Sequence, residues 1–144
     1  MGILGTSSEP SDSLRVSPLQ MSLAVAALSN QGESPAPRLV SAVNTPQAGW
    51  VILPSEEEAK TILASAAANA AAEQLVIPGT PFWMSVTRVP NGTDPEAPVF
   101  TWVTAGTTSA WPGSPLALAF ILEEDNPDLA YDIGLQLLKS TIKP

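Results

Sequence analysis

The stretch that decides the fold is residues 16–32, which read VSPLQMSLAVAALSNQG and are followed at residues 37–40 by PRLV. Ser17 can accept a hydrogen bond from the backbone N–H of Gln20, and the Gln20 side chain can reach back to the N–H of Ser17, which is a capping box. Pro18 takes the first helical position, where a missing N–H is not needed. Gly32 favours the left-handed backbone that ends a helix. We predict a largely buried helix here. Its apolar stripe comprises Leu19, Leu23, Ala26 and Ala27, widened by Met21, Val25 and Leu28.

Composition excludes several classes of function. The chain has 144 residues, the size of one ordinary domain, and its 6 basic and 14 acidic side chains give a net charge of -8. An acidic chain does not attract nucleic acid or anionic lipid, so we predict no nucleic-acid partner. It contains no cysteine and no histidine, which excludes disulfides, thiol nucleophiles, Cys/His zinc sites and a Ser-His-Asp triad. The acidic runs 56–58 and 123–125 lack the spacing of a calcium loop, so we predict no metal and no cofactor.

The chain carries no targeting segment of its own that we recognise. No apolar run reaches the length of a membrane span, and Met1–Gly5 is neither basic enough nor long enough to be a signal peptide. Residues 1–13 are rich in Ser, Gly and acid, and we predict that they form a loose N-terminal segment. Residues 14–144 are predicted to form one domain or part of one.

The first half of the chain predicts short strands and a second helix. Residues 38–43 and 50–53 are β-prone runs separated by a turn. Ser55 with Glu58 forms a second capping box, so we predict an alanine-rich helix that continues to about Leu75. Its small-residue face comprises Ile62, Leu63, Ala66, Ala67 and Ala70.

The second half predicts a sheet. Residues 82–89 and 99–104 alternate between apolar and polar side chains around a turn cluster at 90–95, which favours an antiparallel hairpin. The continuous apolar run 116–122 is typical of a strand covered on both faces, and the acidic residues 123–125 follow it as gatekeepers. A last helix begins at the cap Asn126. Its predicted stripe is Leu129, Ile133, Leu137 and Leu138. The fold class is therefore α+β, with three C-terminal antiparallel strands, flanking helices and a covering C-terminal helix.

These segments, in this order, resemble the penicillin-binding protein transpeptidases. Residues 17–21, the helix that they open and its Asn-Gln-Gly ending before Pro-Arg-Leu-Val are similar to the segment between the second and third catalytic motifs of that family. The last two strands and C-terminal helix of the family resemble Phe100–Gly106, Leu116–Glu123, Asp125–Pro127 and Ile133-Gly134. The likeness spans residues 14–138. It implies the C-terminal portion of a transpeptidase domain and a location outside the cytoplasmic membrane, in the cell envelope.

The catalytic motifs of the family are not in working positions. The family uses Ser-x-x-Lys, Ser-x-Asn and Lys-Thr-Gly. Ser140-Thr141-Ile142-Lys143 matches the first motif by letter but lies at the far C-terminus, after the segments that it should precede, and the other two motifs are absent. We therefore predict no catalytic residue in this chain, and no enzymatic activity of the chain on its own.

Arg88 is the candidate substrate-binding residue. The family's third motif lies on the strand that corresponds to residues 85–89, and Arg88 is the nearest basic side chain. Its guanidinium can hold a substrate carboxylate with two parallel hydrogen bonds, while the simpler interpretation is a solvated edge residue, because Val89-Pro90 stand where Thr-Gly is needed. Asn91-Gly92-Thr93 fits both a glycosylation sequon and a hairpin turn. The four tryptophans can line a glycan or peptide groove, or they can be aromatic residues of the core or of the cover of the sheet: Trp50, Trp83, Trp102 and Trp111.

Two functional hypotheses follow from the resemblance. In the first, the chain is a non-catalytic C-terminal segment that contributes scaffold to the peptidoglycan cross-linking machinery. In the second, it is a free-standing binding or assembly module that kept the scaffold and lost the acyltransfer chemistry. In the family, the last strand pairs with a strand from earlier sequence, so residues 116–122 should present an open edge. We expect this edge to pair with the N-terminal portion of a transpeptidase domain or with a second copy, and a peptidoglycan peptide is a further candidate ligand.

Overall fold

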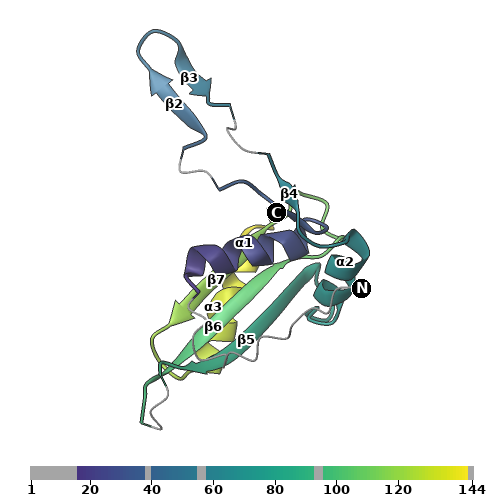
Figure 1. Cartoon of the computed structure of the whole chain (residues 1–144), viewed down its shortest axis with the longest axis vertical. Helices are drawn as coiled ribbons and strands as arrows, with labels where there is room; N and C mark the ends of the chain where they lie inside the picture. The colour runs from purple at the N-terminus through teal and green to yellow at the C-terminus, as the bar shows by residue number, and fades with distance from the viewer. Residues whose placement is uncertain (1–15, 38–39, 55–57, 93–95, 143–144) are drawn as a thin grey trace, which may run out of the picture.

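The computed structural model describes residues 16–37, 40–54, 58–92 and 96–142. Its centre is an antiparallel sheet in the order β5-β6-β7, made of β5 (Phe82–Pro90), β6 (Val99–Thr107) and β7 (Ala117–Leu122). Helix α1 (Pro18–Ser29) lies on one face of the sheet, and α3 (Pro127–Ser140) lies on the other (Figure 1). The three C-terminal strands are neighbours and a C-terminal helix covers them, so the predicted α+β fold class is confirmed.

The middle strand divides its side chains between the two helices, because successive residues of a strand point to opposite faces. Val103 and Ala105 share a buried cluster with Ala130 and Leu138 of α3. Trp102 and Thr104, which alternate with them along β6, point to the face that carries α1, and they line a hollow together with Met21. The pairing of β5 with β6 matches the hairpin predicted from alternation, although β5 ends at Pro90 rather than at 89 and β6 ends at Thr107 rather than at 104.

Helix α1 begins as predicted. The backbone N–H of Ser17 donates to Gln20 Oε1 at 2.9 Å, and the N–H of Gln20 donates to Ser17 Oγ at 3.2 Å. Its end also matches the prediction, since Gly32 has a φ of 93°. The predicted burial is wrong for the first turn, where Leu19 is 62% exposed. Only the C-terminal half of the helix packs between the sheet and a second helix, so Val25 rather than Leu19 enters the core.

The junction between α1 and the sheet is a buried polar contact. The indole Nε1–H of Trp83 on β5 donates to Ser29 Oγ at 3.2 Å, and both side chains are buried. Gly106 of β6 lies opposite Trp83, and a Cβ there would collide with the Ser29 hydroxyl. A glycine at this position therefore lets the end of the helix rest directly on the backbone of the sheet.

The second helix starts later than the sequence predicts. Helix α2 spans Ser65–Glu73, and its N-cap Ala64 has no side-chain cap; Ser55 of the predicted capping box lies outside the described residues. Before the helix, β4 (Lys60–Thr61) pairs with β1 (Glu33–Ser34), and the carbonyl of Gly32 accepts hydrogen bonds from the next two N–H groups. These non-local bonds hold residues 60–63 in an extended conformation. The buried side chains are consequently Ala68 and Ala72, and the predicted face is exposed instead.

Helix α3 confirms its predicted cap and part of its predicted stripe, since Leu138 is buried and Ile133 is half-buried. Asn126 Oδ1 accepts the N–H of Leu129 at 3.1 Å. The buried residues are Ala130, Gly134 and Leu138, whereas Leu129 and Leu137 are exposed. A Cβ on Gly134 would lie 2.9 Å from Met84 Cε, so the helix approaches the sheet through its small residues. Strand β7, predicted to be covered on both faces, is only half-buried.

A two-stranded hairpin stands away from this body (Figure 1). It consists of β2 (Ala42–Thr45) and β3 (Gly49–Ile52), paired antiparallel. The first strand therefore begins later than predicted, while Arg38 and Leu39 lie outside the described residues, as does the predicted loose segment 1–13. Within the described ranges, no helix has the length and apolarity needed to cross a membrane.

We predict that Ser29→Ala lowers the free energy of unfolding by about 1–3 kcal/mol, because it leaves the buried indole N–H of Trp83 without an acceptor. Urea unfolding followed by circular dichroism measures this. Ser22→Ala is the matched control in the same helix, since the Ser22 hydroxyl donates only to the carbonyl of Leu19. Equal losses in the two variants would contradict the role assigned to the Trp83 contact.

Candidate functional site

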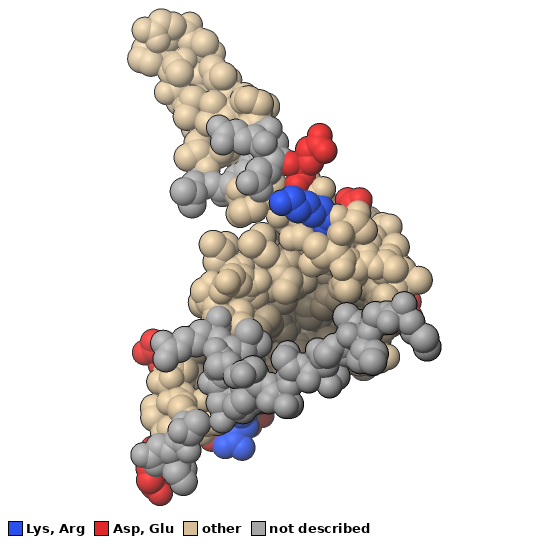
Figure 2. All heavy atoms as spheres, in the orientation of Figure 1, with Lys and Arg blue, Asp and Glu red and all other residues tan. Residues whose placement is uncertain are grey.

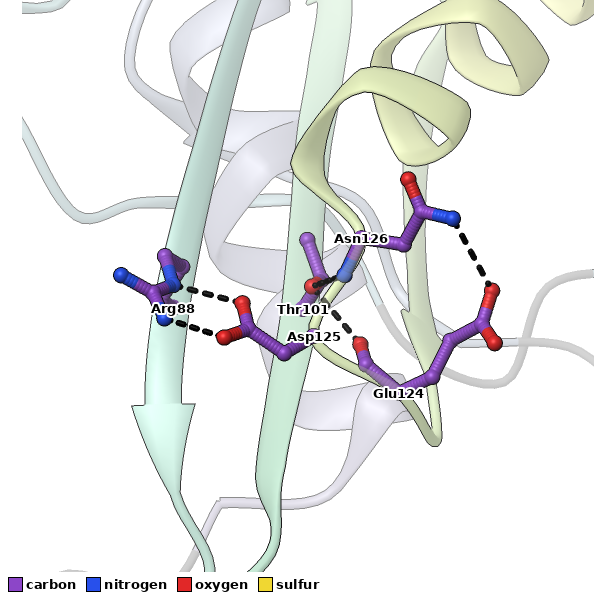
Figure 3. Close-up of polar contacts among 5 residues, drawn as sticks. All are labelled: Arg88, Thr101, Glu124, Asp125 and Asn126. Carbon is purple, nitrogen blue, oxygen red and sulfur yellow. Dashed lines mark hydrogen bonds and ion pairs between the residues drawn. The ribbon is translucent and has the colours of Figure 1, made fainter.

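Arg88, the predicted substrate-binding residue, lies on the side of β5 that faces the start of α3 (Figure 3). Its Nε donates to Asp125 Oδ1 at 2.6 Å, and its Nη2 donates to Asp125 Oδ2. Asp125 belongs to the turn that joins β7 to α3. We predicted that the Arg88 guanidinium binds a substrate carboxylate with two parallel hydrogen bonds. In the structure, it already makes both bonds to a carboxylate of the same chain. The role of Arg88 toward a substrate stays a prediction, and such a substrate would have to displace Asp125.

The ion pair shifts the pKa values of both of its partners. The hydrogen bond to Asp125 and its negative charge raise the pKa of Arg88, and the hydrogen bond from Arg88 lowers the pKa of Asp125 below its ordinary 3.8. The side chains are 60% and 38% exposed, so water screens the attraction strongly. The pair therefore orients the turn before α3 more than it stabilises the fold.

Thr101 anchors the same turn from the middle strand (Figure 3). Its buried hydroxyl donates to the carbonyl of Glu124 at 2.8 Å and accepts the backbone N–H of Asn126 at 3.1 Å. No sequence motif predicted a role for Thr101. Its role could have been predicted from its position, because Thr101 places a hydroxyl on the core-facing side of an alternating strand, where a buried polar group needs a hydrogen-bond partner.

The described residues contain no assembled catalytic or metal centre that we can identify. The Ser140 hydroxyl donates to the carbonyl of Leu137 at 2.7 Å, at the end of α3, while Lys143 of the letter match lies outside the described residues. In the same described ranges, no three Asp or Glu side chains lie close enough together to hold a metal ion.

The four tryptophan side chains lie in different surroundings. Trp83 is buried in the core, and Trp111 packs against Phe82 with a distance of 5.4 Å between ring centroids. Trp50 is 73% exposed on the hairpin, and Trp102 lines a hollow on the sheet. The core interpretation thus holds for Trp83 and Trp111, and the groove interpretation is compatible only with Trp102.

The hollow that contains Trp102 lies on the α1 side of the sheet (Figure 2), and we call it the sheet trough. Its volume is about 800 Å³. It is lined by Val16, Met21, Thr87, Val89, Pro90, Asn91, Gly92, Phe100, Trp102, Thr104 and Ile121. None of these side chains carries a charge, so the trough suits an uncharged, largely apolar group. Asn91 and Gly92 of the possible sequon lie at its rim, while Thr93 is outside the described residues.

Comparison with known proteins supports the fold. No protein-family model matches the chain, and no curated protein matches it. Among solved structures, the chain is similar to the crystal structure of PBPA from Mycobacterium tuberculosis, with a TM-score of 0.61 and 20% sequence identity. The likeness covers 76% of this chain and 26% of that one. The chain therefore has a fold like that of a penicillin-binding protein, as its resemblance to the transpeptidases implied, and it spans about a quarter of PBPA.

The Arg88–Asp125 pair predicts a pH dependence of stability. Because folding lowers the pKa of Asp125, the contribution of the pair is present above pH 3.8 and is lost as pH falls through the lower pKa of the folded state. Asp125→Asn should therefore lower the urea midpoint slightly at neutral pH and not at all in strong acid. Asp132→Asn, which removes a carboxylate from α3 outside the pair, is the control. A difference between Asp125→Asn and the unsubstituted chain that persists in strong acid would rule out the ion pair as its cause.

Proposed function

We propose that this chain is a non-catalytic C-terminal segment of a transpeptidase-like domain that contributes scaffold to peptidoglycan cross-linking in the cell envelope, outside the cytoplasmic membrane. The observation that carries the proposal is the likeness to PBPA over 76% of the chain, combined with the lack of Ser-x-Asn and Lys-Thr-Gly in its sequence. A sheet with this topology can support an active site, but these residues do not supply the nucleophile. Any acyl transfer therefore depends on residues of another polypeptide segment.

The two edges of the sheet support this role. Along β5, the N–H of Met84 donates to the carbonyl of Leu75, and the N–H of Ile77 donates to the carbonyl of Phe82, so the start of that edge is covered. At the other edge, β7 pairs only with β6 within the described part of the chain. An edge strand of six uncharged residues is a template for an added strand. The proposed partner is the N-terminal portion of a transpeptidase-like domain, which would place its own strand beside β7.

A second candidate function is a free-standing binding or assembly module. The observation that favours it is the amount of uncharged apolar surface that the described residues leave uncovered, on the hairpin and in the sheet trough. In this version, a peptidoglycan peptide is a candidate ligand, and Arg88 would bind its carboxylate in place of Asp125. The reading frame before Met1 separates the two candidates, because the scaffold hypothesis expects Ser-x-x-Lys and Ser-x-Asn to be encoded there.

We predict that a fluorescent penicillin does not label this chain covalently, since none of its serines is placed as a nucleophile by the motifs of the family. Denaturing electrophoresis measures the labelling, with an active transpeptidase as the positive control. Covalent labelling of the isolated chain would overturn the non-catalytic assignment.

The same proposal predicts a change at β7 on binding. Hydrogen exchange at the outward-facing amides of β7 should be fast in the isolated chain and slow in the presence of PBPA from which the matched segment has been deleted. The inward-facing amides of β6 are the internal control, because both of their neighbours are already present. A monomer by light scattering whose β7 amides are protected without a partner would contradict the open edge.

A further inference from the structure

The turn after β5 begins with Asn91-Gly92, a pair that the proposed function does not use. Both residues are exposed. The backbone N–H of Asn91 donates to the carbonyl of Pro98 at 2.8 Å, so the pairing of β5 with β6 extends to this residue. No hydrogen bond in the described part of the chain engages the side-chain amide of Asn91. That amide is therefore exposed to water, one position before the backbone nitrogen of Gly92.

Gly92 leaves this backbone nitrogen uncrowded. Its φ is 133°, in a region that residues with a Cβ rarely adopt. A Cβ built on Gly92 would meet Ala97 Cβ at 3.8 Å, an ordinary van der Waals contact, so the described neighbours do not close around this part of the turn. Since glycine has no side chain, its nitrogen can approach the side chain of the preceding residue with little steric resistance.

We propose that Asn91 is a site of spontaneous deamidation in the folded protein. Hydroxide removes the proton of the Gly92 backbone N–H, and the nitrogen attacks Cγ of Asn91. The bond between this nitrogen and Cγ forms, while the bond between Cγ and the side-chain nitrogen breaks. The side-chain nitrogen takes a proton from water and leaves as ammonia, which restores the hydroxide. The product is a cyclic imide, a succinimide, and no group is oxidised or reduced.

Water then opens the ring at either of its two carbonyl carbons. Attack at Cγ breaks the bond from Cγ to the Gly92 nitrogen and gives aspartate with an unchanged backbone. Attack at the backbone carbonyl carbon of residue 91 gives isoaspartate, whose main chain runs through the former side chain and is longer by one carbon. Either product adds one negative charge to the net charge of -8. The connection between β5 and β6 therefore changes in charge, and in part of the molecules also in length, as the protein ages.

The other four asparagines of the chain lack this combination. Asn30 Nδ2 donates to a backbone carbonyl at 3.1 Å, and Asn126 Oδ1 accepts a backbone N–H of α3 at 3.1 Å. Asn44 and Asn69 lie inside β2 and α2, where the regular structure holds the backbone. Each of the four is followed by a residue that has a side chain, and the residue after Asn126 is a proline, which has no N–H to lose. They are internal controls for Asn91.

The inference goes beyond the proposed function, because it concerns the turn between β5 and β6 and makes no use of the edge of β7. Incubation of the folded, full chain in buffer tests it. Peptide mapping by mass spectrometry should show loss of the Asn91 amide at least about tenfold faster than loss at any other asparagine, because only there is the attacking nitrogen uncrowded. The rate should rise about tenfold from pH 7 to pH 8, since hydroxide removes the proton.

Both aspartate and isoaspartate should appear at position 91. Isoelectric focusing follows the added charge, and enzymatic methylation of isoaspartate with a labelled methyl donor measures the lengthened product. Asn91→Gln keeps an amide but would have to close a larger ring, so this variant should retain the charge of the fresh chain through the same incubation. Asn69→Gln makes the same change in α2 and should leave the conversion at Asn91 unaffected.

Three results would overturn the inference. The first is an Asn91 amide that persists while another asparagine is converted. The second is conversion to aspartate without isoaspartate, because a succinimide opens at both carbonyl carbons. The third is a glycan attached to Asn91 in the protein isolated from its own cells, which would assign the exposed amide to the sequon that begins there.

Discussion

The contact between Trp83 and Ser29 is the buried polar contact that joins α1 to the sheet. An indole N–H in the core needs an acceptor, and here the hydroxyl of Ser29 at the end of α1 accepts it. That hydroxyl reaches the indole only because Gly106 offers no side chain at the crossing point. One hydrogen bond and one missing Cβ therefore help to position α1 on the sheet, together with the buried apolar cluster of Val25, Ala72 and Trp83. The sheet trough lies on the same face, beside Met21 in the first half of α1.

On the opposite face of the sheet, close packing rather than a hydrogen bond positions the helix. There the helix packs through small residues, with Gly134 against Met84, and the approach of α3 is set by shape rather than by a polar contact. Polar groups determine only where this helix begins. Thr101 holds the turn from the inside, while the Arg88–Asp125 pair holds it from the solvent side. The strand β6 takes part in both arrangements and connects the two layers.

Local sequence signals predicted the fold well wherever a few neighbouring residues determine the outcome. The capping box at Ser17 and the cap at Asn126 formed as predicted, since each depends on residues within one helical turn. The late start of α2 was missed, because it depends on the carbonyl of Gly32, some thirty positions away in the chain. The partner of Arg88 was missed for the same reason, as Asp125 lies 37 residues further on. Apolar periodicity also overestimated burial at Leu19, because it does not reveal whether a second layer lies above a helix.

The short pairing of β1 with β4 has a consequence for how this protein can vary. Glu33 pairs with Thr61 and Ser34 pairs with Lys60, as neighbours in two antiparallel strands. The β2–β3 hairpin and its flanks, residues 40–54 (the hairpin arm), lie between these two strands in the sequence, so the ends of the segment that contains the arm are held next to each other. A segment whose ends are held together by the body can change in length at a small entropic penalty, because loop closure depends only weakly on the number of residues enclosed. The arm is therefore a modular insertion. It can be shortened, exchanged or replaced by another small domain while the sheet and its two covering helices keep their arrangement.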